Sequence, residues 1–148
     1  MERIGVYFIG ARGNVATTAM VGAFAISQGR SPATGMVTDG PEFKGLPLPG
    51  VQDLVFGGAA VSETPLDQKA LELGEARILP LQLAMDLKEE LAALDKQLHT
   101  VRGFPFGAVP EGGYLAELTR IEERLARFRS DNNLDRVVVV NLCSTEPH

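Results

Sequence analysis

The sequence has one cysteine, no excess of basic residues and no long apolar run, and each shortage argues against a class of protein. Cys143 cannot form a disulfide within the chain or build a cluster of thiolate metal ligands, which favours a reducing, cytoplasmic setting. The net charge of −5 argues against a surface for nucleic acid or an anionic membrane. No stretch reaches the roughly 18 apolar residues of a membrane span, and the first ten residues lack the pattern of a secretion signal.

What is present fits one globular α/β domain. The chain has 148 residues, of which 45% are hydrophobic, enough to bury a core of its own. Apolar runs and helical periodicity alternate along it, which predicts parallel β-α-β units and a doubly wound sheet with helices on both faces. We predict four parallel strands, and place them at residues 3–9, 36–38, 53–56 and 136–142.

The segment between the third and fourth predicted strands reads as helical. Ser62 is a candidate helix cap, and leucines three and four positions apart extend a helical stripe as far as Leu98, which places His99 at a helix end. A second amphipathic stripe runs from Leu115 to Phe128. We therefore expect one partial domain over 1–148 with a helical insertion at about 62–131.

The first predicted turn has the features of a phosphate cradle. Gly10 permits a tight turn, Gly13 permits close approach of a ligand or of the following helix, and a helix beginning near Asn14 directs free N–H groups outward. Arg12 stands where the dinucleotide fingerprint has a second glycine. From the residues alone, the loop is equally well an ordinary turn between a strand and a helix.

Further polar residues follow the other predicted strands. Ligands of doubly wound sheets bind beyond the carboxyl ends of the strands, which here carry Asp39, the Gly57–Gly58 pair and residues 141–146. Asp39 lies about 20 to 30 residues past the glycines, where a carboxylate can bind a ribose hydroxyl. Its alternative is a turn aspartate before Gly40. The sequence offers no metal-ligand spacing.

Three segments together resemble the amino-terminal part of the myo-inositol-1-phosphate synthase family, in its archaeal and bacterial branch. They are GARGNVATTAMVGA (10–23), FGG (56–58) and VVVVNLCSTEP (137–147), and they occur in the family's order. The resemblance implies a Rossmann-like domain that binds NAD. It also implies a role in inositol and phospholipid biosynthesis. The reaction that it implies is the conversion of glucose 6-phosphate to inositol 1-phosphate by internal oxidation, aldol closure and reduction.

The resemblance also implies which residues contact NAD. The glycine loop would hold the pyrophosphate through Gly10, Ala11, Arg12, Gly13, Asn14 and Val15, where Arg12 either helps the anion or crowds it. Gly58 would approach the adenosine, and Cys143, Ser144 and Thr145 would lie beside the ribose and nicotinamide. Many relatives have an acidic residue where this chain has Ala60, so Asp39 is the remaining candidate for the ribose.

No catalytic residue can be assigned, because the resemblance implies that the catalytic lysines lie beyond residue 148. We expect the chain to bind NAD without turning over glucose 6-phosphate, and to need a complementing polypeptide or a homo-oligomer. The alternative is a stand-alone nucleotide-binding or sensing module. An apolar surface is expected where the remaining part would pack.

Overall fold

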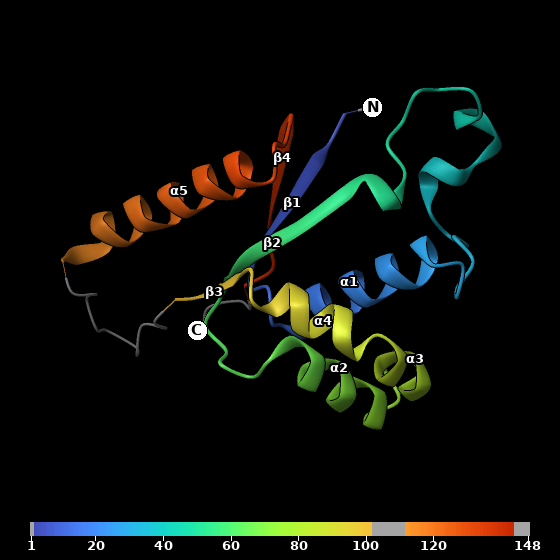
Figure 1. Cartoon of the computed structure of the whole chain (residues 1–148), viewed down its shortest axis with the longest axis horizontal. Helices are drawn as coiled ribbons and strands as arrows, with labels where there is room; N and C mark the ends of the chain where they lie inside the picture. Colours follow the sequence, from blue (N-terminus) through green and yellow to red (C-terminus); the bar gives the residue numbers. More distant parts are fainter. Residues whose placement is uncertain (1, 102–111, 144–148) are drawn as a thin grey trace, which may run out of the picture.

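A four-stranded parallel sheet organises the protein. The computed structural model describes residues 2–101 and 112–143. The strands are β1 (Ile4–Ile9), β2 (Leu54–Ala60), β3 (Leu98–Thr100) and β4 (Arg136–Asn141), in the order β3-β2-β1-β4. The chain thus builds outward from β1 on one side and returns to its other side with β4 (Figure 1). The predicted α/β class and parallel sheet are confirmed.

Helices cover both faces of this sheet. One face carries α1 (Asn14–Ser27), α2 (Leu66–Glu75), α3 (Leu81–Asp86) and α4 (Lys88–Asp95), and α5 (Gly113–Asp131) lies on the other (Figure 1). Alternate residues of β1 serve the two layers, since Phe8 enters the larger core and Tyr7 the core beneath α5. In the described part of the chain, no helix is long and apolar enough to cross a membrane.

Glycines in the strands make room for α5. A Cβ at Gly57 would lie 2.5 Å from the ring of Phe128, and one at Gly5 would lie 2.7 Å from the same ring. Phe128 is 7% exposed and stands 5.4 Å from Tyr7, ring centre to ring centre. The Phe128 ring can therefore pack close to the sheet because the two strand residues beneath it are glycines without a side chain.

The predicted strand at 36–38 is wrong. Val37–Asp39 form a short 3-10 helix, η1, which is followed by η2 (Pro41–Phe43) and η3 (Val51–Asp53). Backbone bonds close locally, with the Asp39 N–H donating to the Met36 carbonyl at 3.1 Å. Val37 is 73% exposed, so this segment buries too little apolar surface to be held as a strand.

Two further boundaries differ from the sequence prediction. The strand placed at 53–56 continues to Ala60, so Gly57 and Gly58 lie within β2 and not beyond its carboxyl end. The long middle helix breaks at Leu87 into α3 and α4, and His99 lies in the short edge strand β3, not at a helix end. The strands predicted at 3–9 and 136–142 are confirmed within one residue at each end.

Candidate functional site

A cleft of about 450 Å³ opens beyond the carboxyl ends of three strands. Segments that follow β1, β2 and β4 line it, and they contribute Gly10, Gly13, Asn14, Val15, Ala16, Ala60, Val61, Ser62, Leu142 and Cys143. The strand order reverses between β1 and β4, and a doubly wound sheet places its ligand at such a reversal. The position of the cleft is therefore that of a binding site for this class of fold.

The turn after β1 needs glycine at its first position. Gly10 has φ +94°, and a Cβ there would come within 3.1 Å of the Leu142 carbonyl oxygen after β4. The N–H groups of Gly10 and Ala11 both donate to the Ala59 carbonyl, at 2.8 and 3.0 Å. The turn is thereby fastened to β2 while it passes close to β4.

Helix α1 opens toward the cleft with an uncapped first turn. Gly13 is its N-cap residue and accepts the first helical hydrogen bond, from the Thr17 N–H at 3.0 Å. Among the described residues, no side chain caps this end, and the N–H groups of a helix's first turn have no partner within the helix. Since Asn14, Val15 and Ala16 line the cleft, the positive end of the helix dipole is available to an anion there.

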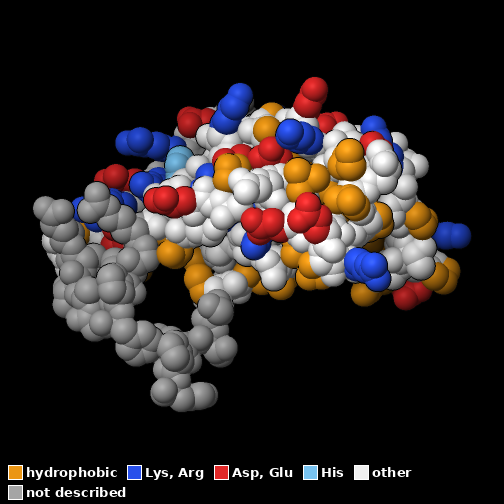
Figure 2. Space-filling model, turned by 90° about the horizontal axis from the view of Figure 1, so that it is seen from below, with side chains coloured by type: hydrophobic (Ala, Val, Ile, Leu, Met, Phe, Trp, Pro, Cys, Tyr) orange, Lys and Arg blue, Asp and Glu red, His pale blue; other side chains and the backbone are white. Residues whose placement is uncertain are grey.

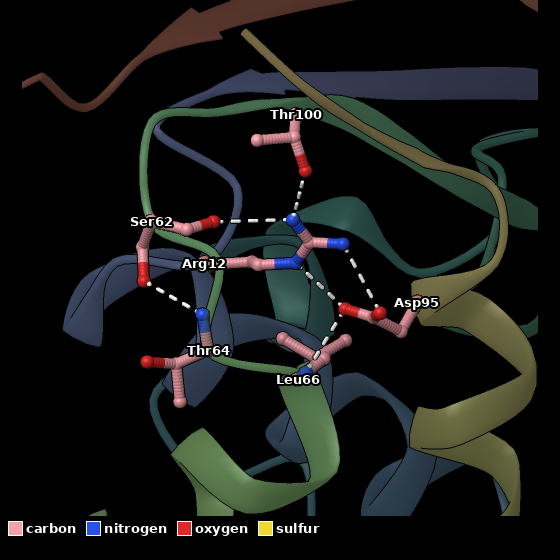
Figure 3. A network of polar contacts seen from close by, with 6 residues as sticks. All are labelled: Arg12, Ser62, Thr64, Leu66, Asp95 and Thr100. Carbon is pink, nitrogen blue, oxygen red and sulfur yellow. Dashed lines mark hydrogen bonds and ion pairs between the residues drawn. The ribbon is translucent and has the colours of Figure 1, made fainter. Parts of the chain in front are cut away.

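Arg12 is not among the residues that line the cleft, and its side chain lies in a polar network with Asp95, Thr100 and Ser62 (Figure 3). Its side chain is only 7% exposed, and Nε and Nη2 donate to the two carboxylate oxygens of Asp95, at 2.8 and 3.1 Å. Nη1 donates to the Thr100 hydroxyl at 2.8 Å and to the Ser62 carbonyl at 3.1 Å. All three guanidinium nitrogens of Arg12 are thus engaged by protein groups, whereas the sequence left open whether this side chain helps or crowds an anion.

Asp95 also accepts a hydrogen bond from the first turn of α2, the helix for which Ser62 was predicted to be the cap. The Leu66 N–H donates to Asp95 Oδ1 at 2.9 Å, whereas the Ser62 hydroxyl accepts from the Thr64 N–H. Pro65 is the N-cap residue and gives no side-chain bond. The carboxylate at the end of α4 therefore joins the glycine turn to the first turn of α2.

Three other predicted contacts lie away from the cleft. Ala11 is fully buried, and a Cβ at Gly58 would approach Ala11 Cβ at 2.7 Å and the Phe8 carbonyl at 2.3 Å. Gly58 is thus small because the turn after β1 packs on it, and it does not line the cleft. Asp39 lies in η1, near the carboxyl-terminal end of α1 and far from the turn at its start (Figure 1).

The segment after β4 brings one predicted residue to the cleft. Cys143 is exposed, lines the cleft, and donates its backbone N–H to the Asn141 side-chain oxygen at 3.1 Å. The predicted contacts of Ser144 and Thr145 lie outside the described residues. Of the eleven residues predicted to contact NAD, the cleft therefore brings together Gly10, Gly13, Asn14, Val15 and Cys143.

The cleft offers an anion mainly backbone groups. Among the described residues, its lining contains no Asp, Glu, His, Lys or Arg, and across residues 2–101 and 112–143 no three metal-ligating side chains come together. The shifted pKa values belong to groups outside it. Burial raises the pKa of Tyr7, which Arg124 partly offsets, and burial followed by Arg124 and Arg127 lowers the pKa of His99.

Sequence reasoning missed Asp95 and Thr100, which hold Arg12. The available signal was Arg12 itself, because a large cation within a run of small residues requires partners wherever it is buried. The identity of those partners was not visible, since they follow in sequence by 83 and 88 residues.

Comparison with known proteins gives a family match and a solved structure of similar fold. Residues 4–148 match the model of an NAD-binding family described as myo-inositol-1-phosphate synthase. The fold resembles the crystal structure of inositol-3-phosphate synthase from Caenorhabditis elegans, with a TM-score of 0.78 and 19% identity. The match covers 98% of this chain and 35% of the worm protein. No curated protein matches the sequence.

Proposed function

The chain belongs to the myo-inositol-1-phosphate synthase family, and on that premise we propose that its glycine turn and the first turn of α1 hold the pyrophosphate of NAD. One observation carries the proposal. The uncapped start of α1 borders a cleft whose described lining has no acidic side chain to repel a phosphate. The turn also fits close approach, because the two glycines that line it leave space at the strand reversal.

The residues of this chain would bind NAD chiefly through their backbone. The N–H groups of Asn14, Val15 and Ala16 would face the pyrophosphate, and Cys143 would lie beside the ribose and nicotinamide. NAD supplies hydride acceptance and donation when it is bound. Ala60 offers no carboxylate to a ribose hydroxyl, so affinity should be modest, since a charged hydrogen bond contributes roughly 1.5–3 kcal/mol.

The proposed reaction of the complete enzyme is the conversion of glucose 6-phosphate to myo-inositol 1-phosphate, by internal oxidation, aldol closure and reduction. This chain spans 35% of the length of the worm enzyme, and the described lining of its cleft has no acid or base besides the Cys143 thiol. We therefore propose that residues 1–148 are a partial Rossmann-like domain, with 62–131 as its helical insertion. We also propose that this chain alone does not catalyse the conversion of glucose 6-phosphate. The lone cysteine supports a cytoplasmic setting.

A second polypeptide segment or a second copy would complete the domain. β4 is an edge strand, and Val138 and Val139 on it are 45% and 48% exposed. Leu115 and Leu118 of α5 are 77% and 56% exposed. Exposed apolar side chains on an edge strand and on α5 support association with a further chain or segment.

Calorimetric titration with NAD tests the binding proposal. Wild-type protein should show saturable binding of NAD at concentrations up to the millimolar range. Gly13→Val should abolish this binding, because the valine side chain would fill the approach to the turn and its Cβ would lie 3.0 Å from the Gly10 carbonyl oxygen. Gly13 has φ −77°, so the substitution adds no left-handed strain. Gly22→Ala on the same helix is the matched control, since its Cβ would meet nothing within 4 Å.

Two results would return this loop to an ordinary turn: no binding by wild type at millimolar NAD, or equal binding by wild type and Gly13→Val. Turnover is tested separately by incubation with glucose 6-phosphate and NAD. Inositol phosphate formed by this chain alone would overturn the proposed inactivity. The alternative function, a nucleotide-binding module, is favoured by the lack of charged side chains in the cleft, and it would be supported if NAD binds but no added polypeptide of the family restores turnover.

A further inference from the structure

A second cavity, of about 590 Å³, lies between α5 and the edge strand β3. It shares no residue with the cleft at the glycine turn. Gln97 and His99 border it from β3 and the turn before it, and α5 contributes Arg124, Arg127 and Asp131. Figure 2 shows the histidine, in pale blue, beside blue Lys or Arg side chains at one end of the molecule. The volume is within the range of small-molecule sites.

The two arginines of this cavity form no ion pair with a described residue. Among the ion pairs of the described residues, none includes Arg124 or Arg127. Nη1 of Arg124 is buried without a hydrogen-bond partner, and so is the hydroxyl of Tyr7 in the core beneath α5. A buried guanidinium N–H without an acceptor is costly. Arg124 itself borders the cavity, so an anion bound there would lie beside its guanidinium.

His99 supports the same electrostatic picture. After burial, the groups that lower its pKa are Arg124 and Arg127, and no carboxylate offsets them. Asp131, the acidic residue that borders the cavity, has Oδ1 engaged by the Ser130 hydroxyl. The neighbourhood of His99 is therefore net positive, and its imidazole is neutral near pH 7, with one N–H to donate.

We propose that Arg124, Arg127 and His99 form a binding site for a phosphate dianion, either inorganic phosphate or the phosphate group of a small monoester. Two guanidinium groups match its charge and offer several N–H donors in forked geometry. The neutral imidazole donates a further hydrogen bond, and its pKa rises when the dianion binds because the anion favours the charged ring.

The test follows the His99 ring by NMR while inorganic phosphate is added at constant ionic strength, with potassium chloride as the balance. His148 is the only other histidine, so a His148→Gln variant assigns the signal. The His99 signal should move saturably at millimolar phosphate, with a rise in its pKa. Arg124→Gln and Arg127→Gln should each weaken binding about tenfold or more, as expected for the loss of a charge-assisted hydrogen bond.

Arg120→Gln on the same helix is the control, because Arg120 is already paired with Glu117 at 2.6 Å, and it should leave phosphate binding unchanged. Arg127 is exposed, so its variant keeps the test decisive if Arg124→Gln fails to fold. A parallel titration with glycerol phosphate separates the two sources, since tighter binding of the monoester identifies an esterified ligand. Unsaturable shifts, equal shifts with chloride, or equal binding by Arg127→Gln and wild type would overturn the proposal.

Discussion

The Arg12–Asp95 pair should be a strong stabilising interaction, and a second pair in the same molecule provides the comparison. Both Arg12–Asp95 and Arg30–Asp86 have a closest N–O distance of 2.8 Å. Their side chains are 7% and 19% exposed in the first pair, but 42% and 37% in the second. Distance is thus held constant while burial changes, and burial determines how strongly water and salt screen an ion pair.

Single substitutions should cost different amounts at the two ends of the buried pair. Asp95→Asn keeps an acceptor for the Leu66 N–H but leaves the Arg12 guanidinium without its charge partner, which should cost about 3–5 kcal/mol of unfolding free energy. Arg12→Met leaves a partly exposed carboxylate that still accepts from Leu66, so we expect about 2–3 kcal/mol. Removal of the Asp95 carboxylate should cost more unfolding free energy than removal of the Arg12 guanidinium, because it leaves the more buried of the two charges without a partner.

Urea unfolding of the single and double variants measures the coupling within each pair. We expect roughly 2–3 kcal/mol for Arg12–Asp95, and about 0.2–1 kcal/mol for the exposed Arg30–Asp86 pair. The coupling should persist at 0.5 M salt only in the buried pair. Equal couplings in the two pairs, or loss of the Arg12–Asp95 coupling in salt, would refute the structural role given to Arg12.

Three further predictions concern the strands and their turn. Gly57→Ala should destabilise the protein by about 1–3 kcal/mol through overpacking against Phe128, and Phe128→Leu should recover part of that loss in urea unfolding; an unchanged midpoint for Gly57→Ala would contradict the close contact. Gly10→Ala should destabilise the protein because Gly10 has φ +94°. Gly22→Ala should instead stabilise α1 by about 0.5–1 kcal/mol. Changes of the same sign in the free energy of unfolding would contradict the different backbone roles of the two glycines. Burial raises the pKa of Tyr7 in the folded state, so the contribution of its neutral phenol to stability is present below pH 10 and is lost as the pH rises through the folded pKa. Tyr7→Phe should remove this loss of stability at alkaline pH. Identical pH profiles of stability for wild type and Tyr7→Phe would contradict the prediction.

The elements that could be predicted are those in which local pattern and burial agree. β1 is a short apolar run that ends at a glycine, and α1 begins where small residues take on helical spacing. The run at 137–140 predicted β4, although the burial is less complete than expected, since Val138 and Val139 are exposed at the sheet edge. In each case the signal lies within one stretch of sequence.

The elements that were missed depend on distant partners. β3 has three residues and continues a helical leucine pattern, so only its pairing with Gly58–Ala60 of β2 identifies it as a strand. Gly57 and Gly58 resemble a turn in sequence because their packing against Phe128 and Ala11 is not visible there. Conversely, the apolar residues at 36–38 resemble a strand but find no sheet to join.

The position of Arg12 explains how a glycine loop can tolerate so large a residue. Glycine is needed in such a loop where backbone must approach a ligand or another strand, and Gly10 and Gly13 occupy those places here. The side chain between them is bound by Asp95, Thr100 and Ser62. The described lining of the cleft has no charged side chain, so an anion bound there would be held by backbone N–H groups and the helix dipole. The cation instead fixes the turn to α2, α4 and β3, which presents those N–H groups on a rigid support.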